Sequence, residues 1–149
     1  MKKLFYSAFA YMVIGVLSGL FYREYTKGKD FTGGTQLSIV HTHLLTLGFI
    51  VLLIVLILEK QFALSESKLF NWFFWTYNVG LVLTAAIMVV HGILQVNGTT
   101  EVSGAIPGIA GVGHIVITAG MVLLFLALRN RIFGATAAKD AATPTPLAG

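Results

Sequence analysis

Four apolar stretches, each as long as a membrane-spanning helix, dominate this 149-residue sequence and constrain its fold more than any other feature. They cover residues 4–22, 37–58, 70–96 and 105–128. A helix needs about 20 apolar residues to cross the hydrocarbon core of a bilayer. Only 11% of the residues are charged, against roughly 25% in soluble domains. The sequence therefore predicts an all-α membrane protein with four spans in contact with lipid, and no separate soluble domain.

Short connections between the stretches favour an antiparallel up-down four-helix transmembrane bundle. We assign residues 1–134 to the bundle and expect residues 135–149 to form a flexible C-terminal tail. Cytoplasmic loops carry an excess of Lys and Arg, which sets orientation. An N-in/C-in topology places Lys2, Lys3, Lys60, Lys68, Arg129, Arg131 and Lys139 inside, and Arg23, Lys27 and Lys29 outside. We expect a multi-pass protein of the bacterial cytoplasmic membrane, with no nucleic-acid partner.

Small and polar residues recur in each stretch at alternating steps of three and four, which places them on one face of a helix. We expect these faces to point toward the bundle axis, while Leu, Ile and Val face lipid. The faces are Ala8, Tyr11, Gly15, Ser18, Tyr22 and Tyr25; Ser38, His41, Leu45, Gly48 and Leu52; Tyr77, Gly80, Thr84, Met88, His91 and Gln95; and Gly104, Pro107, Gly111, His114, Thr118, Met121 and Phe125.

All four histidines lie within apolar stretches, where an ionisable side chain is costly and commonly marks function. His41, His91 and His114 lie 14 to 17 residues from the predicted inner ends of their stretches. At about 1.5 Å per residue this distance is roughly 21 to 26 Å, in the outer half of the membrane. A lone intramembrane histidine is as often a hydrogen-bonded packing residue, but three at one depth favour a shared site.

His43 differs from the other three histidines. Residues i and i+2 of a helix lie about 200° apart, so His41 and His43 cannot bind one metal unless the helix is distorted. His43 then serves a second centre or another face, or it is structural. We therefore rank His41, His91 and His114 above His43 as ligands.

The ligand set favours haem b as the cofactor, with a Cu or Zn ion as the alternative. The chain has no cysteine, so imidazole is its strongest metal ligand. Zinc or copper needs three or four close ligands, whereas haem needs only one or two axial ligands. Gly48 and Gly111 would let a planar ring approach the backbone, although such glycines equally suit close helix packing. Arg23 is a candidate partner for the haem propionates.

The segment His41-Thr42-His43, followed by Gly48, resembles the H-x-H helix of the haem–copper oxidase catalytic subunit. In that family the two histidines point to opposite sides of one helix and ligate different haems. The whole chain is also similar to a family of small four-span bacterial membrane proteins of unknown function. The resemblance implies haem ligation by His41 or His43, with His91 or His114 as partner. We expect a His41–His114 axial pair first, with His91 an alternative ligand or the occupant of a second site.

Three functions follow as hypotheses. The first is haem-based electron transfer or small-gas binding near the outer membrane face. The second is binding or transport of a Zn, Cu or Fe ion by the same histidines. The third is a non-catalytic subunit of a larger membrane complex, in which the histidines only form hydrogen bonds. A redox partner or a homodimer packed through Gly15 and Gly19 fits any of them. The His-His pair and the His-Tyr arrangement that build the oxidase copper centre are not found, so we do not expect the chain alone to reduce oxygen. Whether it is an enzyme stays open, with a non-enzyme favoured for the isolated chain.

Overall fold

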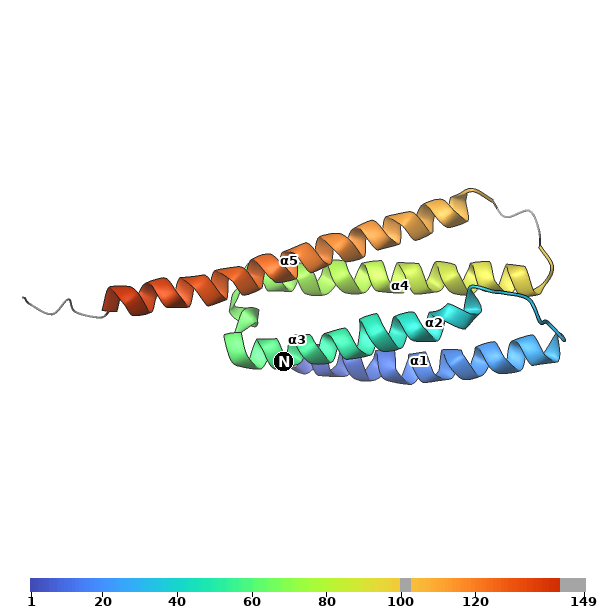
Figure 1. Ribbon diagram of the computed structural model, residues 1–149, viewed down its shortest axis with the longest axis horizontal. Helices are drawn as coiled ribbons and strands as arrows, with labels where there is room; N and C mark the ends of the chain where they lie inside the picture. Colours follow the sequence, from blue (N-terminus) through green and yellow to red (C-terminus); the bar gives the residue numbers. More distant parts are fainter. Residues whose placement is uncertain (100–102, 143–149) are drawn as a thin grey trace, which may run out of the picture.

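Four long helices make up the protein (Figure 1). The computed structural model describes residues 1–99 and 103–142, with side chains described up to residue 134. Three of the long helices are single elements: α1 (Lys2–Gly28), α4 (Lys68–Val96) and α5 (Ala105–Ala142). The second span consists of α2 (Leu37–His43), the π-helical segment η1 (Leu44–Ile50) and α3 (Val51–Phe62). A short 3-10 turn, η2 (Leu64–Glu66), precedes α4. No strand occurs among the described residues. The four predicted helices are confirmed, and each is long and apolar enough to cross a membrane.

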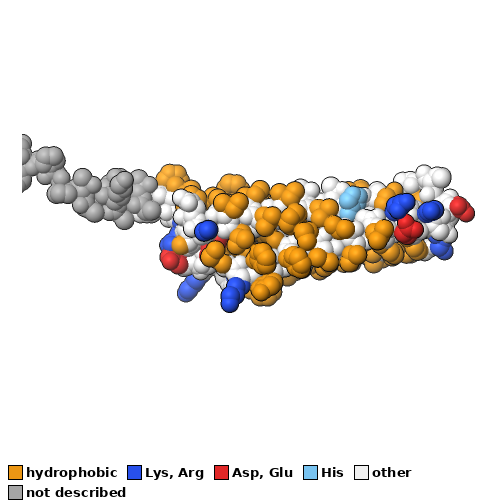
Figure 2. Space-filling model, turned by 90° about the horizontal axis from the view of Figure 1, so that it is seen from below, with side chains coloured by type: hydrophobic (Ala, Val, Ile, Leu, Met, Phe, Trp, Pro, Cys, Tyr) orange, Lys and Arg blue, Asp and Glu red, His pale blue; other side chains and the backbone are white. Residues whose placement is uncertain are grey.

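Many large hydrophobic side chains are exposed on the outer surface of the bundle. In Figure 2 a broad band of hydrophobic side chains occupies the middle of the molecule, and charged side chains gather at its two ends. Aromatic and aliphatic side chains of α1, α4 and α5 are more than half exposed on this surface, among them Tyr6, Trp72 and Ile115. Water would make this exposure costly, so the surface is suited to a lipid bilayer.

The second span lies between α1 and α4, and α5 packs along α4 (Figure 1). Side chains also join α1 to α4 along their length. Lys3 Nζ donates to Asn71 Oδ1 at 3.0 Å, and Tyr11 donates its hydroxyl to Asn78 Oδ1 at 2.9 Å. The buried core consists of Leu, Phe, Tyr and Val side chains drawn from all four spans. All four spans therefore share one core.

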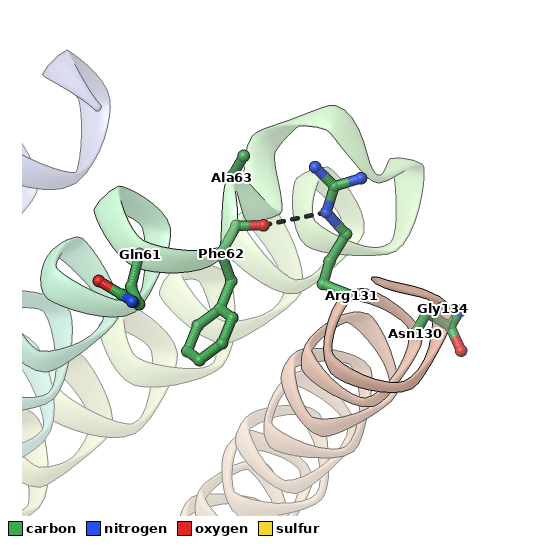
Figure 3. Close-up of a pocket in the computed structure, with 6 residues that line it drawn as sticks. All are labelled: Gln61, Phe62, Ala63, Asn130, Arg131 and Gly134. Atoms are coloured by element: carbon green, nitrogen blue, oxygen red, sulfur yellow. Dashed lines mark hydrogen bonds between the residues drawn. The ribbon is translucent and has the colours of Figure 1, made fainter. Parts of the chain in front are cut away.

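The turn between α3 and α4 is fixed by polar contacts. Ala63 ends α3 in the left-handed conformation with φ of 50°, and the buried Glu59 carboxylate accepts a hydrogen bond from Ser65 N at 2.7 Å. Arg131 of α5 donates from Nε to the carbonyl oxygen of Phe62 at 2.9 Å (Figure 3). The same guanidinium pairs with the Glu66 carboxylate. A cavity of about 550 Å³ lies beside this contact. Arg131 therefore connects the C-terminal part of α5 to the end of α3.

The backbone of α5 remains helical through Ala142, past the predicted boundary at residue 134. Residues 135–142, the first part of the predicted tail, continue this helical backbone. Residues 143–149, which belong to the same prediction, lie outside the described residues.

The π-helical segment η1 changes the rotation of the second span. Val51 N donates to Thr46 O, five residues back, instead of to Leu47 O, four residues back. The freed carbonyl oxygen of Leu47 accepts the hydroxyl of Tyr77 at 3.1 Å. A π turn takes up one residue more than an α turn, so each residue before it is shifted by one position around the helix.

This shift overturns the predicted inward face of the second span. The buried residues of this span are Leu37, Val40, Leu44, Gly48, Leu52, Val55 and Glu59. Gly48 and Leu52 keep their predicted place, but before them the buried face runs through Val40 and Leu44 rather than His41 and Leu45. The prediction was wrong because it assumed an uninterrupted α-helix. The face predicted for α4 is confirmed at Tyr77, Gly80, Thr84 and Met88, and the face predicted for α1 is confirmed at Ala8, Tyr11 and Gly15.

The predicted face of α5 is also wrong by one position. The buried residues of α5 are Gly113, Ile117, Gly120, Leu124 and Ala127, while His114, Thr118 and Phe125 are exposed. The close approach of α4 decides this rotation. A Cβ on Gly120 would lie 2.9 Å from Tyr77 Cα, and a Cβ on Gly80 would lie 2.7 Å from Ile117 N. Small residues allow such backbone contact between membrane helices.

Candidate functional site: a histidine-lined cavity

Three histidines from three helices line one cavity of about 430 Å³. They are His43 at the end of α2, His91 near the end of α4 and His114 near the start of α5. The rest of the lining is mainly apolar and consists of Gln36, Ile39, Ile87, Met88, Pro107, Ala110 and Gly111. The first turns of α5 lean away from α4 in Figure 1, at the same end of the bundle as α2. The cavity therefore lies where α2, α4 and α5 meet.

His43 and His114 lie next to each other in the cavity lining. Their ring centres are 6.4 Å apart and the ring planes are nearly perpendicular, at 89°. Each ring contacts a backbone carbonyl of its own helix, His43 Nδ1 at 3.2 Å from Ile39 O and His114 Nδ1 at 2.8 Å from Ala110 O. A carbonyl only accepts hydrogen bonds, so Nδ1 carries the proton in both rings. In a neutral ring held this way, Nε2 is the nitrogen that carries the lone pair, and a metal-binding histidine commonly has its other ring nitrogen bonded to such a carbonyl.

His91 is placed by the contact between the start of α2 and the end of α4. Thr35 donates its hydroxyl to Gly92 O at 3.0 Å, and Gln36 N donates to Gln95 Oε1 at 2.8 Å. Gly92 is buried, and a Cβ there would lie 3.1 Å from Leu37 Cα. This contact brings His91 to the cavity wall formed with α2.

His41 lies elsewhere. A Cβ on Gly19 of α1 would lie 3.5 Å from both Cβ and Cγ of His41, and His41 is not among the cavity-lining residues. Its Nδ1 is buried and has no hydrogen-bond partner among the described residues. The expected pairing of His41 with His114 is not what the structure shows, because η1 rotates His41 toward α1. The histidine of this span whose ring lies next to His114 is His43, not His41.

Of the other predicted cofactor-binding residues, one lines the cavity and two lie away from it. Gly111 lines the cavity, and nothing lies within 4 Å of the position of a Cβ there. Gly48 instead packs against the ring of Tyr11, where an added Cβ would lie 2.7 Å from Tyr11 Cβ. Arg23 pairs with the adjacent Glu24 at 3.3 Å on an exposed part of α1, and α1 contributes no residue to the cavity. Gly48 therefore serves helix packing, whereas Gly111 leaves open space.

The spacing of His43 and His114 suits two ligands on opposite sides of one metal. An imidazole nitrogen binds a transition metal at about 2 Å, and the ring centre is about 1 Å further, so two such rings have centres about 6 Å apart. The described residues contain no group of three or more His, Cys, Asp or Glu side chains that could hold an ion together. His43 and His114 are thus a pair of neighbouring imidazoles rather than part of a larger group of such side chains among the described residues.

Sequence reasoning missed the two carbonyls that orient the rings. Ile39 and Ala110 lie four residues before His43 and His114, but every residue has a carbonyl, so no side-chain pattern reveals them. Ile87 and Ala110 were missed as lining residues for a related reason. Both belong to faces whose rotation depends on how α4 and α5 pack.

The fold and the cavity define an all-helical membrane protein of four spans with a histidine-lined site between three of its helices. The chain belongs to the family described as "Protein of unknown function (DUF2871)", whose family model matches residues 1–131. The expectation of a small family of unknown function is thereby confirmed, and no relation to the haem–copper oxidase subunit is shown. Neither a curated protein nor a solved structure matches the chain.

Proposed function

We propose that this protein binds haem b in the cavity between α2, α4 and α5, with His43 and His114 as axial ligands. The observation that supports this proposal is the matched state of the two rings. Both donate Nδ1–H to their own helix, and their centres are 6.4 Å apart. His43 and His114 would hold the haem in this largely apolar cavity, and a bound haem would supply one-electron chemistry. This axial pair replaces the His41–His114 pair expected from the sequence.

The number of axial histidines decides which chemistry the site performs. Two ligands give low-spin iron suited to electron transfer, and one ligand leaves a position open for a small gas. His91 also lines the cavity and provides a third imidazole. It is therefore the alternative to either axial ligand, or the group beside a bound gas. For electron transfer we also propose a partner that exchanges electrons with the haem, either a separate redox protein or a larger membrane complex.

The proposal includes an antiparallel up-down topology with both termini in the cytoplasm of a bacterium. The positive-inside rule supports this orientation, because Arg131 and Lys60 lie at one end of the bundle and Lys27 at the other. The cavity then lies in the outer half of the membrane. We also propose that His41-Thr42-His43 is related to the H-x-H helix of the oxidase subunit. A homodimer is a separate part of the proposal.

A bare metal ion is the second candidate for the same site. Met88 lines the cavity beside the histidines, and a thioether favours a soft ion such as Cu(I) over zinc. The two candidates differ in the composition of the purified protein. Copper or zinc without porphyrin would support the second candidate, and iron in equal amount with porphyrin would support the first.

An absorption spectrum of the protein purified from haem-replete cells tests the proposed function. We expect a Soret band that shifts on reduction, together with a pyridine haemochrome assay that gives about one haem b per chain. A colourless protein that also takes up no haemin when titrated in lipid vesicles would contradict the proposal.

Filling the cavity from Gly111 should displace the cofactor without disturbing the bundle. We expect Gly111→Leu to lower haem content about 10-fold, because the new side chain enters the cavity while nothing lies within 4 Å of its Cβ position. Gly108→Leu is the matched control, since Gly108 is equally open but does not line the cavity. Haem content per folded protein is the measurement. Equal loss in both variants would contradict this location.

A further inference from the structure

We propose that Tyr77 is a positioning residue for His43, acting through the carbonyl oxygen of Leu47. The proposal starts from the hydrogen bonds of η1. Val51 N donates to Thr46 O, so Leu47 O loses the donor it would have in an α-helix. Tyr77 of α4 is fully buried, and its hydroxyl donates to that oxygen at 3.1 Å. A buried carbonyl without a donor is costly, above all in a membrane, so this hydroxyl stabilises the π turn.

The π turn decides which way His43 points. One residue corresponds to about 100° of rotation around an α-helix. The part of the span after η1 is held by buried Leu52 and Val55 and by the Glu59 contact with Ser65 N. If η1 relaxed to an α-helix while this part stayed in place, α2 would rotate by about 100°. His43 would then leave the cavity wall that it shares with His114.

The consequence for the proposed haem site follows directly. Tyr77 does not line the cavity, yet it sets the direction of one of its two axial ligands. This inference rests on the proposed function only for its effect on haem. The effect of Tyr77 on the orientation of His43 is expected in the apoprotein as well, where it is measured without haem.

The test compares Tyr77→Phe with Tyr11→Phe in lipid vesicles. Tyr11 is also a buried tyrosine, but its hydroxyl donates to the side chain of Asn78 rather than to the π segment. Solid-state NMR on apoprotein with labelled histidine rings reports the His43–His114 contact. We expect the wild type and Tyr11→Phe to show this contact and Tyr77→Phe to lose it. Infrared spectroscopy with labelled Leu47 carbonyl should show a band shift in Tyr77→Phe only.

Deletion of Thr46 provides the rescue. Thr46 is exposed, and its removal lets Val51 N reach Leu47 O as in an α-helix while α2 keeps its rotation. In this background Tyr77→Phe should leave the His43–His114 contact intact. Haemin titration should give about a 10-fold loss of affinity for Tyr77→Phe, and no loss when Thr46 is also deleted.

Two results would overturn the inference: an unchanged ring contact in Tyr77→Phe, or an equal loss of that contact with and without Thr46. A different result separates the inference from the proposed function. If the ring contact responds to these variants as expected but the wild type binds no haemin, the proposed function is refuted and the role of Tyr77 stands.

Discussion

Replacement of His43 by alanine is expected to lower haem content strongly, whereas the same replacement at His41, two residues earlier, should leave the haem in place. His43 lies with its ring centre 6.4 Å from that of His114, and its Nε2 is free to bind iron. His41 packs against Gly19 instead and does not line the cavity. Haem content per chain, measured by the pyridine haemochrome assay, is the readout. We expect a loss of at least about 10-fold for His43→Ala and less than about twofold for His41→Ala.

The two variants control for each other because both remove a half-buried imidazole from the same helix. His114→Ala should behave like His43→Ala. His91→Ala should retain haem if His43 and His114 are the axial pair. The reverse order, with His41→Ala losing the haem and His43→Ala keeping it, would mean that the axial pair predicted from the sequence is right and that the assignment to His43 is wrong.

Gly92→Ala is expected to destabilise the bundle by about 2 kcal/mol, although alanine favours a helix more than glycine does. The added methyl group would collide with the backbone of Leu37, whose Cα is 3.1 Å from the Cβ position. Separation of α2 from α4 would also weaken the bond between the Thr35 hydroxyl and Gly92 O. Unfolding in mixed micelles measures the free energy, and we expect haem content to fall with it.

Gly108→Ala is the matched control for that variant. Gly108 lies in α5 with nothing within 4 Å of its Cβ position. Alanine there should be neutral or stabilise the helix by up to about 1 kcal/mol. If Gly92→Ala were as stable as Gly108→Ala, the close approach of α2 and α4 at Gly92 would be wrong.

Side-chain chemistry made part of the site predictable. His91 and His114 were selected because an ionisable residue in a hydrophobic span needs a reason, and both line the cavity. Gly111 was selected because a glycine on the same helix face as a histidine leaves room, and the space beside it is open. Arg23 was selected for its charge and position alone, and in the structure it pairs with Glu24 away from the cavity. Composition identifies candidates, but it does not say which neighbour each one meets.

The rotation of each helix was harder to predict than its ends. The face of α1 was right because Ala8 and Tyr11 follow an uninterrupted α-helix. The face of α5 was wrong because Gly113 and Gly120 allow α4 to approach on a side that the polar residues did not mark. The assumption that polar side chains face a common axis fails when a helix packs mainly on one neighbour.

The sequence by itself determined that the chain forms four apolar helices long enough to cross a membrane, with every histidine inside one of them, because length and hydropathy control both properties. The tertiary structure alone decided which histidine of the second span enters the cavity. That choice depends on one extra residue in the π turn, which is stable because Tyr77, thirty residues away in the chain, donates a hydrogen bond to Leu47 O. A local pattern cannot encode such a contact, since the donor belongs to another helix.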